Sequence, residues 1–115
     1  MWVKLDDTFT DHPKVMEVGP LCGWLYVCGL TYCARYLTDG FIRDSQVKKL
    51  ADVKNATNLA KRLVSVGLWD KVNGGYRIHD YSDYNPPAET VKNKRKNEAK
   101  RLANFRQKQT ENETL

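Results

Sequence analysis

The chain has 115 residues and a formal net charge of +5, with 41% hydrophobic and 29% charged residues. This balance is typical of one compact globular domain and excludes a largely disordered chain. No apolar run approaches the length that spans a bilayer, and the first residues lack the pattern of a secretory signal. We therefore expect a cytoplasmic protein that has no membrane partner.

The first elements expected are a short strand at residues 2–5, where apolar and polar residues alternate, and a short helix at about residues 12–18. Asp11 is a suitable N-cap for that helix, and Pro13 fits its first turn. Residues 19–20, Gly-Pro, interrupt the chain and start the next helix.

Apolar residues recur at steps of three and four across residues 21–37, which predicts the main core helix. The three tryptophans are expected in the core, because large aromatic side chains dominate small cores; they are Trp2, Trp24 and Trp69. The three cysteines all fall on the predicted helix, five or six residues apart, where they do not face one another. Free, buried thiols are therefore expected, without disulfides or a thiolate metal site, at Cys22, Cys28 and Cys33.

A short extended piece at residues 41–43 precedes a second short helix, capped by Asp44 or Ser45 and ending near residue 50. A third helix is expected at residues 56–66, with Gly67 at its C-terminal end. Residues 68–72 and 76–80 flank Asn73-Gly74-Gly75, and Asn-Gly between two such runs is a strong hairpin signal.

Two helices joined by a turn and followed by a hairpin are the pattern of a winged helix-turn-helix. The predicted fold is therefore mainly α with a small β-hairpin wing, followed by a basic C-terminal helix. We expect the winged helix-turn-helix domain at residues 1–87 and a basic helical extension with a frayed end at residues 88–115.

The third helix has an apolar stripe, and the opposite side has residue types that suit a recognition helix in the major groove. Asn bonds adenine edges, whereas Arg and Lys bond guanine edges or phosphates. The predicted DNA-contacting residues on this helix are Thr57, Asn58, Lys61, Arg62 and Ser65. The alternative is the ordinary solvated face of an amphipathic helix.

The hairpin carries two cations and a polar tip that could contact the DNA backbone as a wing does. The predicted residues are Lys71, Asn73 and Arg77. A plain turn that only holds the sheet together is the alternative.

Residues 88–115 hold eight Lys or Arg and four Glu, a net charge of +4, whereas residues 1–87 have a net charge of +1. This distribution is typical of a nucleic-acid-binding extension, although a solvated helix that aids solubility is the alternative. The cations expected to follow phosphates are Lys92, Lys94, Arg95, Lys96, Lys100 and Arg101.

No arrangement of residues in the sequence suggests catalysis. The only histidines are His12, which precedes a proline at a helix start, and His79, which lies in a predicted strand. No nucleophile triad, metal-ligand cluster or phosphate-binding loop is visible in the sequence. We expect a protein that is not an enzyme, with no cofactor and no metal.

Several runs of the sequence also resemble a known protein family. They are residues 2–5, Phe9, residues 11–15, 39–40, 63–69, 76–81 and 84–86. Together they resemble the N-terminal winged-helix domain of bacteriophage replisome organisers, which are replication initiators similar in style to bacterial DnaD proteins. The resemblance implies a winged-helix fold, binding to origin or operator DNA, and a phage or mobile-element protein in the cytoplasm of a bacterial host. Members of the family usually continue into a second domain that recruits a helicase or its loader. Because the 115 residues stop after the expected basic helix, we expect a stand-alone phage DNA-binding regulator as readily as a helicase-loading protein.

The expected partner is therefore double-stranded DNA, in replication initiation or transcriptional regulation. Two further partners stay open at this point. One is a second copy of the chain in a homodimer, which the apolar surface around Trp24 would permit. The other is a host or phage replication or transcription protein, bound by a protein-interaction module.

Overall fold

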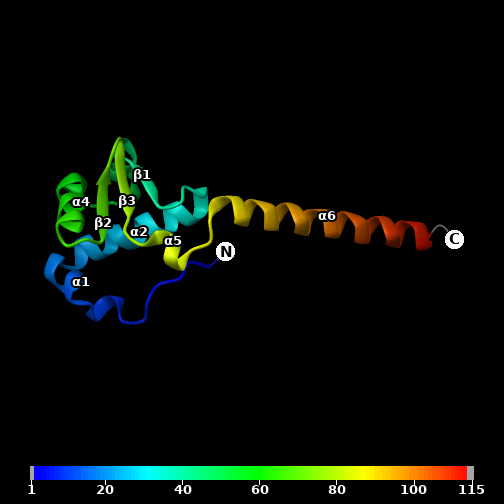
Figure 1. The fold of residues 1–115 in the computed structure, drawn as a ribbon, viewed down its shortest axis with the longest axis horizontal. Coiled ribbons are helices and arrows are strands. Elements are labelled where there is room, and N and C mark those ends of the chain that lie inside the picture. The colour runs from blue at the N-terminus through cyan, green and yellow to red at the C-terminus, as the bar shows by residue number, and fades with distance from the viewer. Residues whose placement is uncertain (1, 114–115) are drawn as a thin grey trace. The chain divides into compact units, whose positions relative to one another are not determined.

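The fold is taken from a computed structural model, which describes residues 2–113. The chain is mainly helical and has a small three-stranded antiparallel sheet (Figure 1). It divides into two compact units, Met1–Asn85 and Pro86–Leu115, which are described separately.

The first unit contains all of the strands and most of the helices. Its elements are the 3-10 turn η1 (Phe9–Asp11), α1 (Pro13–Val18), α2 (Pro20–Tyr36), β1 (Phe41–Arg43), α3 (Asp44–Leu50), α4 (Ala56–Ser65), β2 (Trp69–Val72), β3 (Gly75–Ile78) and α5 (Tyr81–Tyr84). The helices and strands predicted from residue 12 to residue 78 are confirmed, with ends that shift by one or two residues.

The N-terminal residues differ from the prediction in two ways. Residues 2–5 form no strand, and Trp2 is 97% exposed rather than part of the core. Alternation alone does not form a strand without a sheet edge to pair with. The N-cap of α1 is His12 and not Asp11, because η1 already contains Asp11; the His12 Nδ1 accepts a hydrogen bond from the Lys14 N–H at 3.2 Å.

Helix α2 is the centre of the core, but only one of its sides is buried. The fully buried side chains on it are Cys22, Leu25 and Cys33. Trp24 is 56% exposed, so its predicted core position is wrong, whereas the predicted burial of Trp69 is confirmed. A Cβ on Gly29 would lie 2.8 Å from the Trp69 ring, so the Trp69 ring fits only against the glycine-bearing side of α2. That contact fixes which side of the helix faces inward.

Helices α3 and α4 are joined by residues 51–55, and Asn55 has a positive φ of 58° just before α4 begins. The predicted cap of α3 by Asp44 or Ser45 is wrong, because its N-cap is Arg43, which makes no side-chain cap bond. The Asp44 N–H instead donates to the Gly74 carbonyl at 3.1 Å. The start of α3 is thus attached to the tip of the hairpin.

The sheet has the order β1-β3-β2, with both pairings antiparallel. The predicted hairpin is confirmed, and its turn is the two residues Asn73 and Gly74, since Val72 pairs with Gly75. Only Gly74 of the two has a positive φ, at 82°, which fits a type II turn rather than the type I′ turn common for Asn-Gly. Gly75 lies against the Ile42 carbonyl, where any Cβ would collide with the β1 backbone.

The second unit is the helix α6 (Ala88–Glu113), which lies within the helical extension predicted at residues 88–115. Thr110, near the end predicted to fray, is still helical, and residues 114–115 lie outside the described residues. No helix in the described part of the chain combines the length and apolar character needed to cross a membrane.

Candidate nucleic-acid interface

Helix α4 presents one apolar side to the core and one polar side to solvent. The buried side consists of Ala56, Leu59, Ala60 and Leu63. After Ser65 the chain reverses at Gly67, whose φ is 81°; the Gly67 N–H donates to the Val64 carbonyl at 3.0 Å, and the Leu68 N–H donates to the Leu63 carbonyl at 3.0 Å. This pair of bonds is a Schellman motif, which ends the helix where the hairpin begins.

All five predicted side chains on α4 are exposed: Thr57, Asn58, Lys61, Arg62 and Ser65. Lys61 lies opposite the buried side and forms no ion pair with any residue that the structure describes. The Ser65 hydroxyl donates to the Arg62 carbonyl at 2.6 Å, so its hydrogen is used within the helix. Thr57, Asn58 and Lys61 are therefore the side chains on α4 best placed to bind a ligand.

Arg62 differs from its neighbours because it lies at the flank of α4, next to the start of α2. Burial raises the pKa of the Cys22 thiol there, and the nearby Arg62 guanidinium opposes that rise. The Cys22 S–H also donates weakly to the Leu59 carbonyl at 3.7 Å, which ties α2 to α4. Arg62 is thus held near the α2–α4 contact and is suited to the edge of an interface rather than its centre.

The predicted hairpin cations lie on opposite faces of the sheet. Lys71 pairs with Tyr76, and its ammonium lies 4.5 Å from the Tyr76 ring centre, 3.0 Å from an Asp44 carboxylate oxygen and 3.0 Å from the Gly75 carbonyl oxygen. Three contacts within the fold therefore occupy Lys71. Its main role is to fasten the hairpin to the start of α3.

Arg77 points to the other face, opposite Asp70 on β2 and Phe41 on β1. Its guanidinium carbon lies 6.0 Å from the centre of the Phe41 ring. On the same edge, the His79 Nδ1 lies 3.0 Å from an Asp70 carboxylate oxygen, and this hydrogen bond, with the charges of Asp70 and Asp80, raises the pKa of His79. Lys71, Asn73 and Arg77 are all exposed, so all three predicted hairpin residues are accessible to a ligand, although Lys71 is also engaged by the contacts described above.

A further set of cations, which the residue patterns did not single out, lies around α3. Arg43, Lys48, Lys49 and Lys54 are all exposed and lie on or beside the α3–α4 segment. Their signal was present in the charge distribution: residues 43–77 hold eight Lys or Arg and three Asp, a net charge of +5. The near-neutral total for the first unit concealed this local excess.

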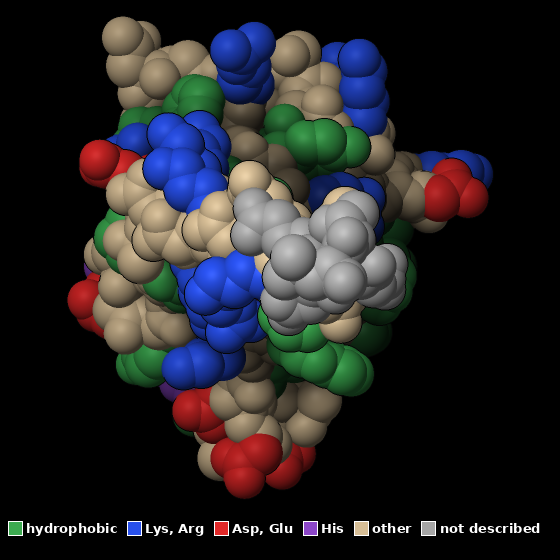
Figure 2. Space-filling model, turned by 90° about the vertical axis from the view of Figure 1, so that its right-hand side faces the viewer, with side chains coloured by type: hydrophobic (Ala, Val, Ile, Leu, Met, Phe, Trp, Pro, Cys, Tyr) green, Lys and Arg blue, Asp and Glu red, His purple; other side chains and the backbone are tan. Residues whose placement is uncertain are grey.

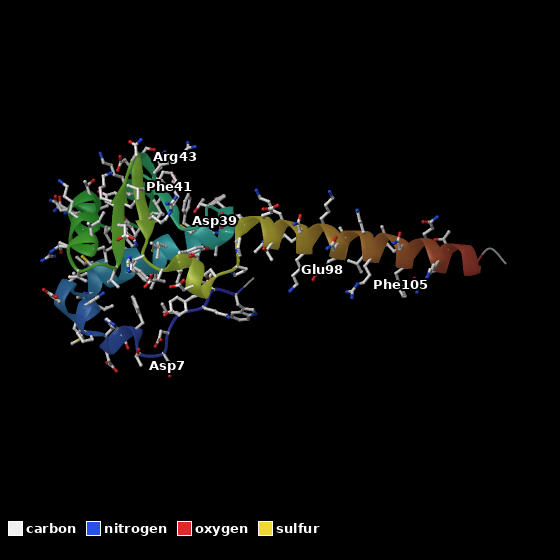
Figure 3. The ribbon with its side chains drawn as sticks, viewed as in Figure 1. Asp7, Asp39, Phe41, Arg43, Glu98 and Phe105 are labelled. Carbon is white, nitrogen blue, oxygen red and sulfur yellow. The ribbon has the colours of Figure 1, made fainter. Side chains whose placement is uncertain are left out.

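The rest of the first unit has the opposite sign. Residues 1–42 and 78–85 hold three Lys or Arg and seven Asp or Glu, a net charge of −4. Figure 3 shows Arg43 beside the hairpin at one end of the unit and Asp7 at the other end. In Figure 2, which keeps the same vertical direction, Asp and Glu side chains gather at the lower edge and also lie at both sides, whereas Lys and Arg side chains lie at the upper edge and across the centre. The first unit is therefore electrically polarised, and α4 belongs to its positive part.

Helix α6 carries its predicted cations on exposed positions: Lys92, Lys94, Arg95, Lys96, Lys100 and Arg101. Successive residues turn by about 100° around a helix, so these six side chains point in several directions. The exposed Phe105 and Glu98 point to the same side in Figure 3, and no continuous apolar stripe forms. An anionic strand could contact this helix on more than one side.

The comparisons with known proteins add no assignment. Searches of protein families, of curated proteins and of solved structures each found no match. The roles of individual residues therefore rest on their chemistry and placement.

A separate cleft of about 650 Å³ lies between the N-terminal arm (residues 2–12), α2 and the segment after β3. Its lining includes the aromatic side chains Phe9, Tyr26, Tyr81 and Tyr84. None of the predicted DNA-contacting residues lines it, and no group of three metal-binding side chains occurs within the described residues. The cleft and the positive part of the first unit are thus different surfaces.

The cysteines are free, as expected, but they are not equally buried. Cys22 and Cys33 have no exposed surface, whereas Cys28 is partly exposed on the outer side of α2. Burial also raises the pKa of the Cys33 thiol to about 11. Cys28 is therefore the thiol that a reagent in solution can reach.

Proposed function

We propose that the first unit is a winged helix-turn-helix domain that binds double-stranded DNA and leaves it chemically unchanged. The order of α2, β1, α3, α4, β2 and β3, together with the sheet order β1-β3-β2, supports this fold. In the proposal, α3 and α4 form the helix-turn-helix and the β2–β3 hairpin is the wing.

The observation that carries the proposal is the exposed polar side of α4 within the positive part of the first unit. A helix that enters the major groove needs a buried apolar side, an exposed side with hydrogen-bonding groups, and cationic neighbours that meet the flanking phosphates. Helix α4 has all three, with Asn58 and Lys61 exposed and Lys48 and Lys49 on the preceding helix. The negative charge of the remaining surface would orient this side toward DNA.

Individual roles follow from the placement of each side chain. Thr57, Asn58 and Lys61 face base edges in the major groove, and Arg62 contacts a phosphate at the edge of the interface. Asn73 and Arg77 contact the backbone from the wing, whereas Lys71 holds the wing in place. The cations of α6 neutralise further phosphates.

The test is binding of labelled duplexes of several sequences by the full chain at several salt concentrations. Lys61→Ala/Arg62→Ala is expected to lower affinity by roughly tenfold or more and to flatten the preference among sequences. The control Lys4→Ala/Lys14→Ala removes the same charge from the cleft side of the first unit and is expected to change affinity by about twofold at most. Equal losses in the two variants would refute the role of α4.

An alternative function is a protein-interaction module that binds a host replication or transcription factor. The exposed apolar side of α2, with Leu21 57% and Trp24 56% exposed, favours it. The same experiment separates the two functions. If the first unit is a protein-interaction module, the cations of α6 can still bind duplexes, but without preference among sequences and with no greater loss for Lys61→Ala/Arg62→Ala than for the control. Replication initiation and transcriptional regulation both begin with duplex binding, so this test comes before any distinction between them.

A further inference from the structure

Helix α2 has an apolar outer side that no other part of the first unit covers. Leu21, Trp24 and Tyr36 are 57%, 56% and 62% exposed, and Cys28 and Tyr32 beside them are partly exposed. Across the 17 residues of α2 the only charged side chain is Arg35. Contiguous exposed apolar patches on a protein surface, when they exceed a few hundred Å², mark interaction sites.

We propose that a second copy of the chain covers this side, with the two α2 helices packed antiparallel about a twofold axis at Cys28. Five positions at steps of three and four share the outer side: Leu21, Trp24, Cys28, Thr31 and Arg35. This spacing is that of the contact positions in paired helices. A twofold contact needs a surface that is complementary to itself.

The outer side of α2 has this self-complementarity only in the antiparallel direction. Cys28 is the midpoint of Pro20–Tyr36, so an antiparallel pair places Trp24 of one copy beside Tyr32 of the other. The two Arg35 side chains then lie about 21 Å apart along the axis, at 1.5 Å per residue. A parallel pair would bring the two Arg35 cations together, which costs free energy.

The charge of the surface also favours a second copy over a charged partner. A nucleic acid or an acidic peptide would need cations on this side, and Arg35 is the only one that α2 offers. A contact made by one helix of each copy is small compared with a typical specific interface, so we expect a reversible dimer with a dissociation constant in the micromolar range. Because α4 packs on the opposite side of α2, its polar side stays exposed in such a dimer. The inference therefore does not depend on DNA binding.

The first experiment is sedimentation equilibrium of the full chain without DNA, from about 1 to about 200 µM, the range in which weak specific contacts associate. The unmodified chain is expected to pass from monomer to dimer. Trp24→Glu places a charge in the centre of the contact and is expected to weaken dimerisation at least tenfold. Tyr84→Glu is the matched control, because this aromatic side chain is 66% exposed outside α2, and it should dimerise normally.

The second experiment needs no change to the apolar side. A short bifunctional thiol reagent is expected to join two copies through Cys28, and Cys28→Ser is expected to prevent the cross-link, because Cys22 and Cys33 are fully buried. Circular dichroism checks that every variant is folded. A chain that stays monomeric at all concentrations overturns the proposal and leaves this side to a different protein. A dimer that survives Trp24→Glu, or a cross-link that survives Cys28→Ser, overturns it as well.

Discussion

Two parts of the chain carry nearly the same positive charge, +5 on residues 43–77 and +4 on residues 88–115, but they carry it in different ways. In the first part, helices α3 and α4 and the hairpin hold the cations around a buried core. In the second part, one helix distributes them around its own axis. Charge alone gives affinity for any anionic polymer, whereas a preference among sequences needs side chains held in fixed positions. We therefore expect residues 88–115 to contribute affinity for any duplex and residues 43–77 to contribute the preference among duplex sequences.

The largest expected effect comes from helix α6. Replacing Lys92, Lys94, Lys96 and Lys100 by Gln in the full chain should reduce the slope of log affinity against log salt by about 3.6, at about 0.9 per phosphate contact. When salt rises from about 50 to about 200 mM, the total loss of affinity should be roughly 100 times smaller for this variant than for the unmodified chain. Duplex titrations at four salt concentrations measure the slope.

The same variant also tests whether the two contributions are separate. The preference among duplex sequences is expected to stay the same, because the first unit is unchanged. If the ranking of duplex sequences changed with these four substitutions, α6 would take part in sequence recognition. The two positive parts of the chain would then not have separate roles.

The next effect concerns the attachment of the hairpin to β1. Gly75→Ala would press a Cβ against the Ile42 carbonyl and the Arg43 backbone, so we expect the free energy of unfolding to fall by about 3 kcal/mol. The preference among duplex sequences should weaken as well, while the salt-dependent affinity proposed for α6 should persist. Urea denaturation followed by tryptophan fluorescence measures the stability.

Gly74→Ala is a comparison variant for the hairpin, since a Cβ at Gly74 meets no atom within 4 Å and the cost is confined to its positive φ. A larger destabilisation by Gly74→Ala than by Gly75→Ala would show that turn conformation, and not the close approach of β1, limits the hairpin.

The sequence predicts the helices and the hairpin between residues 44 and 78 well because their local signals agree with one another. Asn73-Gly74 marks the hairpin, and the apolar spacing of α4 identifies its buried side without any knowledge of distant residues. Helix α2 lacks such a signal, since apolar residues surround it. Its orientation depends on the Gly29–Trp69 contact, which joins residues 40 positions apart and is invisible to local periodicity.

The candidate site was predictable to a similar extent. Residue type and helical spacing identify Lys61 as exposed and available. They cannot show that Lys71 would find Asp44, 27 residues away, and become part of the framework. Nor can a total charge near zero reveal the cations around α3, because the acidic residues that offset them lie elsewhere in the first unit.

The two hairpin cations give the next, smaller effect. Arg77→Ala is expected to lower duplex affinity about threefold and to reduce the salt slope by about one. Lys71→Ala is expected to leave affinity within about twofold and to lower the free energy of unfolding by up to about 1 kcal/mol, since its ion pair is half exposed. Parallel titrations and denaturation curves measure both quantities. If Lys71→Ala lowered DNA affinity by more than about twofold, Lys71 would be a DNA-contacting residue and not only a framework residue.

The smallest expected effect is a pH dependence of the stability of the first unit, caused by the titration of His79. The hydrogen bond to Asp70 and the charges of Asp70 and Asp80 raise its pKa above the ordinary value of 6.5. A raised pKa in the folded state means that the protonated histidine stabilises the fold at low pH. This contribution is complete below the unfolded pKa and is lost as pH rises through the folded pKa.

Thermal melting between about pH 5.5 and about pH 8 measures this dependence. The unmodified chain should lose more stability than His79→Asn as pH rises, and Asp70→Asn should reduce the difference because it removes the main cause of the shift. Helix α6 contains no histidine, so its salt-dependent affinity for duplexes should not change over this range. If the melting temperatures of the unmodified chain and of His79→Asn change with pH in the same way, the His79–Asp70 pair contributes no stability. If α6-dependent affinity changes with pH instead, the two positive parts of the chain are not independent.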